Sequence, residues 1–320
     1  MSLKSRLSKL LASMTSSADV VVERVLLHGS HGMKASPRTE VGFVAAVTLG
    51  GVPDIAAAWS SLLRPYGFSL TMHGVFCHAA PVVDFRGTKG SRLGCELADL
   101  LVVVDHTDRS GQTTRRASLI QAKMASKAKR VTLTGKSSKT QLHLYQNWPS
   151  FKFRDAVYGA NSYSLKCSGT GSGTYGVIDR HFKSSAGRSP QWTQHPAQPT
   201  PVAITSEPTF GEFLAHMIGG RSKNYGRIAV PGGADDWSKV VDLLLDITYK
   251  KAFRHAATLG PLSPPRGTTA LAYLTTVPER QVQGWPSAGL GWRPPFDGFE
   301  VIEDESPGGI SVLRLEVFQE

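Results

Sequence analysis

The stretch LGCELADLLVVVDHTDRSGQTTRRASLIQAKMASK, residues 93–127, decides the fold that this sequence predicts. It holds two apolar runs on either side of a polar loop, and runs of Leu, Val and Ile flanked in this way predict a β-hairpin of two buried strands. Each run also carries polar residues that a buried strand normally excludes. Asp99 opens the first run, whereas Gln121 and Lys123 interrupt the second. These three side chains therefore call for an explanation.

Side-chain alternation along a strand predicts which of these residues share a face. Gln121 and Lys123 lie two positions apart and therefore fall on one face of their strand. A hairpin centred on Gly111 would place Asp99 directly across from Lys123 and diagonal to Gln121. Directly opposed Cβ atoms lie about 4.5–5.5 Å apart, so a carboxylate, a carboxamide and an ammonium would gather in one place. A slip of one residue would separate them onto opposite faces.

That trio suits the hydrolysis of phosphodiesters. Carboxylate and amide oxygens are hard ligands that can hold Mg²⁺ while leaving most of its octahedron to water and phosphate. The metal lowers the pKa of its bound water, and a neighbouring Lys orients that water and stabilises the negative charge that develops. The alternative is a buried Asp99–Lys123 ion pair with Gln121 as its hydrogen-bonding partner. Such a pair is weak evidence for stability, because desolvation offsets its attraction.

Asp99 at the head of one strand and Gln121-Ala122-Lys123 at the end of the next resemble the PD-(D/E)XK, restriction-endonuclease-like superfamily. The likeness is to its subgroup with Gln-x-Lys in place of Glu-x-Lys, which includes Mrr-like restriction enzymes and nuclease effectors of bacterial antiphage systems. It covers residues 37–150 and departs from the family at Ala98, where Pro would stand. The resemblance implies a nuclease that uses Mg²⁺, with Mn²⁺ as a substitute, to cut DNA in defence against foreign DNA.

The resemblance also implies auxiliary carboxylates. Family members often carry Glu shortly before the strand Asp, and Glu96 matches this position as a third metal ligand beside Asp99 and Gln121. In a regular strand, however, Glu96 would face away from Asp99 unless a bend re-aims it. Members also place a carboxylate on an earlier helix, for which Glu40 is the candidate. An acid in the first turn of a helix is equally expected from the helix dipole.

The chain is basic, with a formal net charge of +11, which favours a polyanionic partner. A run of cations follows the hairpin and is well placed to contact a nucleic-acid backbone: Lys127, Lys129, Arg130, Lys136 and Lys139. A solvated charged loop is the alternative for this run.

The remaining patterns predict an α/β fold with a mixed central sheet flanked by helices and additional C-terminal helices and strands. The resemblance implies that the core of this fold is restriction-endonuclease-like. We expect an N-terminal helical extension in residues 1–36, a nuclease-like core in 37–180 and a C-terminal elaboration for regulation or assembly in 200–320. Helices are expected over 3–11, 37–48 with Ser36 as N-cap, 53–67, 137–147, 209–220 and 235–260. Besides the hairpin, strands are expected over 68–78, 81–85, 268–277 and 309–318. Residues 184–201 are expected to form a loop.

The sequence favours a reducing, cytoplasmic location. Three cysteines, Cys77, Cys95 and Cys167, are odd in number and lack paired spacing. The N-terminal stretch lacks the apolar core of a signal peptide, and no apolar run reaches the length of a membrane span. We expect no membrane association; the expected partners are DNA and an activating or sensor subunit, and a homo-oligomer is compatible with the sequence.

Two other functions stay open at this point. One is a non-catalytic subunit that uses a nuclease-like scaffold and its basic surface to bind nucleic acid or a partner protein. The other is an RNA-cleaving toxin. A comparison of RNA with DNA substrates would separate it from the DNA nuclease.

Overall fold

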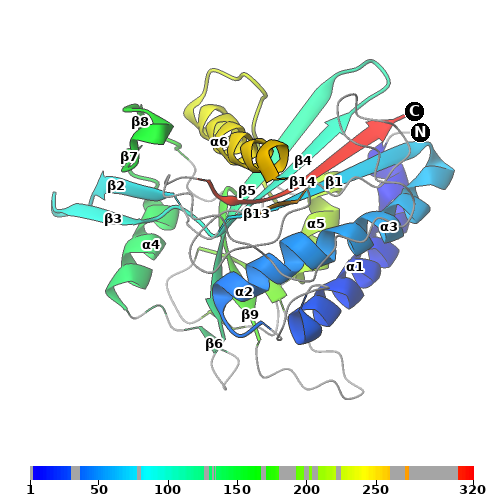
Figure 1. Cartoon of the computed structure of the whole chain (residues 1–320), viewed down its shortest axis with the longest axis horizontal. Coiled ribbons are helices and arrows are strands. Elements are labelled where there is room, and N and C mark those ends of the chain that lie inside the picture. The colour runs from blue at the N-terminus through cyan, green and yellow to red at the C-terminus, as the bar shows by residue number, and fades with distance from the viewer. Residues whose placement is uncertain are drawn as a thin grey trace.

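A computed structural model describes residues 3–29, 37–77, 81–125, 130–131, 133, 135–166, 171–179, 192–197, 202–203, 208–220, 225–259, 271–273 and 309–320. The chain forms an α/β fold in which a mixed sheet lies between helices, as the sequence predicts (Figure 1). The helices are α1 (Leu3–His28), α2 (Glu40–Ala45), a π-helix (Ala46–Gly51), α3 (Val52–Leu63), α4 (Lys136–Asn147), α5 (Phe210–Gly219) and α6 (Asp236–Leu259), with 3-10 turns at Arg64–Tyr66 and Ala156–Tyr158.

The central sheet has the strand order β10-β9-β5-β4-β14-β1-β13, with β12 also paired to β5. Its strands are β1 (Phe68–Phe76), β4 (Leu100–Thr107), β5 (Thr113–Met124), β9 (Gly173–Ile178), β10 (Trp192–Pro196), β12 (Arg227–Ile228), β13 (Leu271–Tyr273) and β14 (Ser311–Gln319). The pairs β5–β9 and β4–β14 are parallel, and the other pairs are antiparallel. The last strand of the chain, β14, therefore lies inside the sheet between β4 and β1.

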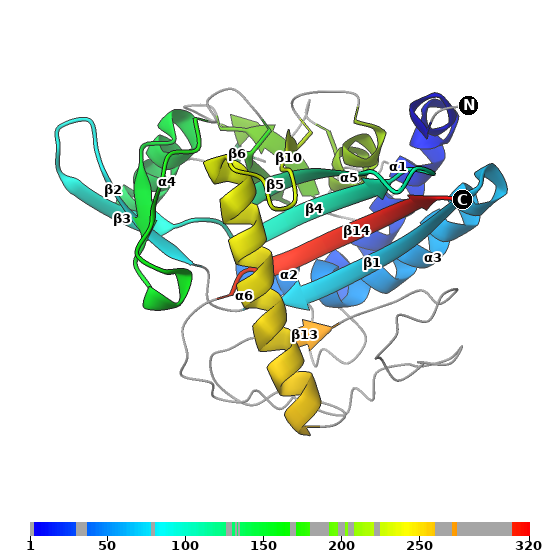
Figure 2. The same ribbon diagram turned by 90° about the horizontal axis from the view of Figure 1, so that it is seen from above.

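A smaller sheet with the order β3-β2-β7-β8 stands at one side of the molecule, next to α4 (Figure 2). It contains β2 (Val82–Arg86), β3 (Arg92–Glu96), β7 (Phe151–Phe153) and β8 (Ser162–Tyr163). The short strands β6 (Arg130–Val131) and β11 (Val202–Ala203) pair with each other. Because β3 ends just before β4 begins, the small sheet leads directly into the predicted hairpin.

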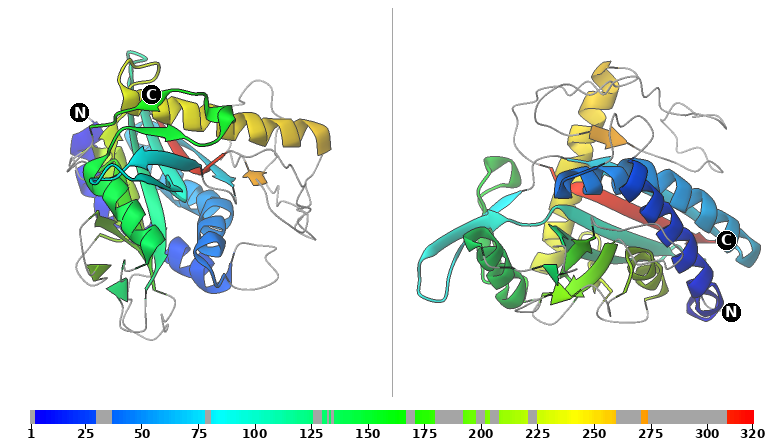
Figure 3. Two further views of the ribbon diagram at one scale, coloured as in Figure 1. Left: turned by 90° about the vertical axis from the view of Figure 1, so that its left-hand side faces the viewer. Right: turned by 90° about the horizontal axis from the view of Figure 1, so that it is seen from below.

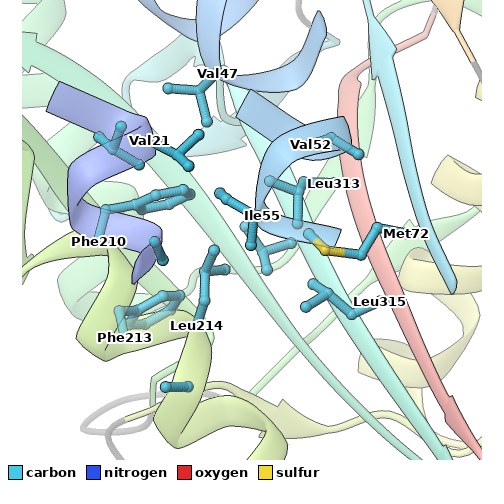
Figure 4. Close-up of a cluster of buried hydrophobic side chains, with 14 of the residues drawn as sticks. Val21, Val47, Val52, Ile55, Met72, Phe210, Phe213, Leu214, Leu313 and Leu315 are labelled. Carbon is cyan, nitrogen blue, oxygen red and sulfur yellow. The ribbon is translucent and has the colours of Figure 1, made fainter. Parts of the chain in front are cut away.

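Two hydrophobic clusters hold the layers together, one on each face of the central sheet. Helix α6 covers one face, and α1, α3 and α5 cover the other (Figure 3). Along β4 the side chains alternate between the two clusters, with Leu101 and Val103 on the α6 side and Val102 on the other. On that other side Ile55 of α3, Phe210 of α5 and neighbouring strand residues interdigitate (Figure 4). Each such fully buried side chain contributes about 1.5–3 kcal/mol relative to exposure.

The two helices predicted over 37–48 and 53–67 form one continuous helical stretch. It begins at Glu40, because the Thr39 hydroxyl accepts a hydrogen bond from the Gly42 N–H and acts as N-cap. The predicted start at residue 37 is therefore wrong, and Ser36 lies outside the described residues. Pro53 is the second residue of α3 and cannot donate a backbone hydrogen bond to the turn before it. That preceding turn is the π-helix, which keeps the stretch continuous.

Joined in this way, Glu40–Tyr66 is long and apolar enough to cross a membrane by length and composition, which corrects the expectation that no segment reaches that length. Most of this stretch is buried inside the protein, as in the core helix of a soluble protein.

Other elements extend or correct the predictions. Helix α1 continues to His28, far past the predicted end at residue 11. The segment 184–201, expected to be a loop, contains β10, which pairs antiparallel with β9. Helices α4, α5 and α6 begin and end within a residue of their predicted bounds.

Candidate active site

The hairpin loop sets the register of β4 and β5. Asp108 and Gln112 flank a loop of three residues, and Gly111 occupies its third position with a φ of 82°. A three-residue hairpin loop places the left-handed residue there rather than at its centre. The Asp108 Oδ1 accepts hydrogen bonds from the Ser110 N–H at 2.8 Å and the Gln112 N–H at 3.0 Å, which holds the loop in shape. The hairpin is therefore centred on Ser110.

This register corrects the predicted pairing by two residues. The ladder ends with Leu100 opposite Ile120, two residues away from the predicted register. The Asp99 N–H donates to the carbonyl of Ile120 at 3.0 Å, so Asp99 stands just outside the ladder, where its carboxylate accepts from Gln121 and from the Ala122 N–H. A shift of two residues preserves the face of every side chain. The predicted gathering of the three residues therefore survives although the pairing was wrong.

Strand β5 continues past the start of β4, which leaves one edge of its last residues open. Carboxylates take the place of the missing strand there. Asp99 Oδ2 accepts a hydrogen bond from the Ala122 N–H at 2.7 Å, and Glu40 Oε1 accepts one from the Met124 N–H at 3.0 Å. In an antiparallel ladder the N–H and C=O of one residue point to the same side, so the Ala122 carbonyl faces this edge as well. Two carboxylates and one main-chain carbonyl thus line the open end of β5.

Glu40 also orients the candidate catalytic lysine. Its Oε2 lies 3.6 Å from the Lys123 Nζ, and both side chains are partly buried. Glu40 is the first residue of α2, whose start is determined by the Thr39 cap, so the helix delivers this carboxylate to the edge of β5. The structure thereby places Glu40 beside Lys123, two residues that lie far apart in the sequence.

A residue that the sequence analysis missed, Gln141 of α4, completes the arrangement. Its Nε2 donates to the Glu96 carbonyl at 3.2 Å and to Gln121 Oε1, and Gln121 Nε2 donates to Asp99 Oδ2. Because a carbonyl can only accept, the Glu96 main chain determines the orientation of both amides. Gln121 therefore presents its amide nitrogen to Asp99, and its oxygen keeps one lone pair beside the hydrogen bond from Gln141.

The same helix face holds Tyr145, four residues after Gln141. Its hydroxyl donates to the Leu97 carbonyl at 2.8 Å, and its ring lies 5.6 Å from that of Tyr175, which pairs with Gln121 across β5 and β9. A buried Gln and a buried Tyr spaced four apart share one side of a helix. That spacing was the available sequence signal, although only packing shows what the two side chains contact.

Glu96 contributes through its main chain in this structure. It ends β3, and its side chain is exposed. Within the part of the chain that the structure describes, no three His, Cys, Asp or Glu side chains stand close enough together to hold a metal ion. A metal at this site would therefore rely on Asp99 together with amide or main-chain oxygens.

Burial makes the Asp99 carboxyl unusual. Desolvation raises its pKa from 3.8 to about 7, although nearby Lys123 and the hydrogen bond from Ala122 act to lower it. The negative charges of Glu96 and Glu40 raise it further. Ionising Asp99 is therefore costly in this buried position, and a cation beside it would lower that cost.

The predicted basic run is described in part. Lys136 and Lys139 are exposed on the N-terminal turns of α4, and Arg130 lies in β6. Lys127 and Lys129 lie outside the described residues.

Of the cysteines, Cys77 and Cys95 are buried free thiols, and Cys167 lies outside the described part of the chain. Burial raises the pKa of Cys95 to about 12, so this thiol is not a ready metal ligand.

No family model, curated protein or solved structure matches this chain. The chemistry of the site has to be argued from its own residues.

Proposed function

We propose that this protein is a metal-dependent nuclease that hydrolyses DNA phosphodiester bonds. The observation that carries the proposal is the convergence of Asp99, Gln121, Lys123 and Glu40 at the open end of β5. The Asp99 carboxylate lies there near the Lys123 ammonium, which is held by the Glu40 carboxylate. Metal-dependent hydrolysis of phosphodiesters can use such a combination of an acidic metal ligand and a cationic group.

The donor set fits Mg²⁺ or Mn²⁺. Asp99 supplies a carboxylate and Ala122 a carbonyl that faces the same edge, whereas Gln121 turns its amide nitrogen to Asp99 and would add its oxygen only after a flip of the amide. Such hard oxygens are the ligands that these ions prefer, and a cation beside Asp99 would offset the cost of ionising a carboxyl whose pKa is raised by burial. When bound, the ion would supply a more acidic water and offset charge on the phosphate.

The side chains of the protein perform the remaining tasks. The Lys123 ammonium donates hydrogen bonds to the attacking water and to a phosphate oxygen, and it stabilises the developing charge. Glu40 keeps that ammonium at the edge of β5 through the 3.6 Å contact. Gln141 and Gln121 hold the Asp99 carboxylate in place from the side of α4.

The test compares the wild type with Lys123→Ala and with Lys250→Ala as a matched control, since Lys250 is an exposed lysine of α6. Each protein is incubated with plasmid, linear DNA and structured RNA in Mg²⁺, Mn²⁺ or EDTA. We expect metal-dependent cutting of DNA that Lys123→Ala loses and Lys250→Ala keeps, with unchanged circular dichroism. A wild type that cuts nothing, even beside its native partners, contradicts the proposal. Cutting of RNA alone supports the toxin hypothesis instead.

A second function, nucleic-acid binding without catalysis, is favoured by one observation. The Gln121 oxygen and the Lys123 ammonium already have protein partners, in Gln141 and Glu40. In this case the wild type binds DNA without cutting it, and Lys123→Ala retains its biological activity.

The resemblance of the motif to antiphage nucleases extends the proposal to a role in bacterial defence. If the purified chain is dormant, the cutting assay requires an activating or sensor partner. Such a partner, recovered by pull-down and added to the assay, should restore cutting.

A further inference from the structure

The small sheet carries its aromatic and aliphatic side chains on one face. Val83 and Phe85 of β2 and Phe151 and Phe153 of β7 are buried, and the Phe85 ring stacks on His143 of α4 at 6.1 Å. Leu93 and Cys95 of β3 pair with Phe85 and Val83 and share this face, so alternation directs the other residues to the opposite face: Val82, Asp84, Arg86, Arg92, Gly94, Glu96 and Lys152. Figures 1 and 2 show β2 and β3 projecting sideways from the body beside α4, and because Phe85 packs on α4, the outer face is the one turned away from this helix.

The outer face is rich in cations. Arg86 pairs across the strands with Arg92, and Lys152 pairs with Asp84. Arg154 follows β7, and Lys89 lies in the turn between β2 and β3. We call these five exposed cations, Arg86, Lys89, Arg92, Lys152 and Arg154, the basic arm.

A single carboxylate organises two of these cations. Asp84 Oδ2 accepts from Arg92 Nη2 at 2.9 Å, and Asp84 Oδ1 accepts from Arg154 Nη2 at 2.7 Å. Gly94 leaves the room for this contact, since a Cβ there would lie 2.4 Å from Arg154 Nη2 and 2.6 Å from Asp84 Oδ1. The face is thus a preformed array with a strong excess of positive charge, in which Arg86, Lys89 and Lys152 have no carboxylate partner among the described residues.

The arm leads to the candidate active site. Strand β3 ends at Glu96, three residues before Asp99, and the Glu96 carbonyl accepts the hydrogen bond from Gln141 that begins the amide chain. Arg86 and Arg92 lie at the far end of the hairpin from the Val82–Glu96 pair, so a nucleic-acid backbone bound along the arm would run down β2 and β3 toward Asp99.

We propose that the basic arm binds the phosphate backbone of duplex DNA and guides it to Asp99, an inference that rests on the proposed nuclease function. Clustered cations on a rigid face suit the regular phosphate rows of a duplex. Single strands are bound in addition by aromatic stacking, but the aromatic side chains of this sheet face inward. The arm therefore offers contacts to the backbone and none to unstacked bases.

Binding is tested with the full chain in EDTA, so that cleavage does not interfere. The variant Arg86→Gln, Lys89→Gln, Lys152→Gln leaves the Asp84 cluster intact, and the control replaces the exposed lysines Lys9, Lys239 and Lys250 by Gln. Fluorescence anisotropy follows binding to a labelled DNA duplex, a single strand of the same sequence and an RNA duplex over a salt series. Circular dichroism and melting confirm that both variants fold.

We expect the arm variant to bind duplex DNA at least tenfold more weakly than the wild type. Each lost phosphate contact lowers the slope of log K against log salt by about 0.9, so three contacts reduce it by about 2.7. The control variant keeps most of its affinity and slope. Equal affinities of the arm variant and the wild type, or a wild type that binds no duplex DNA, overturn the inference, as does a loss confined to RNA or to single strands.

The outcome separates this inference from the proposed function. A wild type that binds duplex through the arm but never cuts it in Mg²⁺ or Mn²⁺ contradicts the nuclease and leaves the arm established. If the wild type and the arm variant cut DNA equally well at every salt concentration, the nuclease is established and the role of the arm is contradicted.

Discussion

Replacing Asp99 with Asn should stabilise the protein, and more so as the pH rises. Asparagine has the same shape, and its side-chain oxygen can still accept from the Ala122 N–H. In the wild type the unfolded chain loses the Asp99 proton near pH 4, whereas burial holds it in the folded chain until about pH 7. Ionising this carboxyl therefore destabilises the fold progressively between these two pH values and fully above them. The Asp99→Asn variant carries no such cost, because its amide does not ionise.

The size of the effect follows from the pKa of the folded state. From pH 5 to about pH 7 the free energy of unfolding of Asp99→Asn gains on that of the wild type by about 1.36 kcal/mol for each pH unit, or about 3 kcal/mol in all. Unfolding a chain of 320 residues carries an entropy of about 0.7 kcal/mol per kelvin, taking about 2.1 cal/mol/K for each residue. The difference in Tm between the two proteins should therefore widen by about 4 °C from pH 5 to pH 8.

Thermal melts of both proteins at pH 5, 6, 7 and 8 measure this difference directly, and other titrating groups cancel because both proteins share them. Adding Mg²⁺ at pH 8 should raise the Tm of the wild type and leave that of Asp99→Asn nearly unchanged, since the variant loses the one charged ligand of the proposed site. A gap in Tm that is the same at pH 5 and pH 8 would refute the reasoning. So would a variant that is less stable than the wild type at pH 8.

Three further predictions follow from the packing. Gln141→Leu removes the donor that orients Gln121, so cleavage by this variant should require a higher Mg²⁺ concentration than cleavage by the wild type. The control Gln146→Leu, on the same helix, should behave as wild type. Equal Mg²⁺ titration curves for Gln141→Leu and the wild type would contradict the role of Gln141. Arg115→Ala removes the cation that Asp105 and Asp242 share, although Asp105 keeps Arg314, and it should cost about 2–3 kcal/mol in urea denaturation. A loss below about 1 kcal/mol would count against this role. Gly74→Ala places a Cβ 2.0 Å from the Thr48 carbonyl oxygen, so the free energy of unfolding should fall by about 3 kcal/mol or more. A variant with unchanged Tm would show that β1 and the π-helix pack less closely than described.

Local patterns in the sequence predicted much of this protein. Alternation along the two apolar runs placed Asp99, Gln121 and Lys123 on one face, because side-chain direction in a strand depends on position alone. The same local rules predicted α4, α5 and α6 closely. They also predicted Glu40 in the first turn of a helix, although not its contact with Lys123.

Packing between distant segments decided the rest. The register of the hairpin depends on how the Asp108 carboxylate folds its loop, and so the predicted register was wrong by two residues. Gln141 joins the site only because α4 packs beside the end of β5. Strand β14 enters the sheet between β4 and β1, and β10 is held by β9.

The sequence by itself thus determined the α/β class and the kinds of side chain that the site contains. Only the tertiary structure decided which of them touch, where the cations of the basic arm gather and why the pKa of Asp99 rises. The physical reason is that side-chain direction follows from neighbours along the chain, whereas desolvation, hydrogen-bond partners and strand order arise from residues brought together by folding.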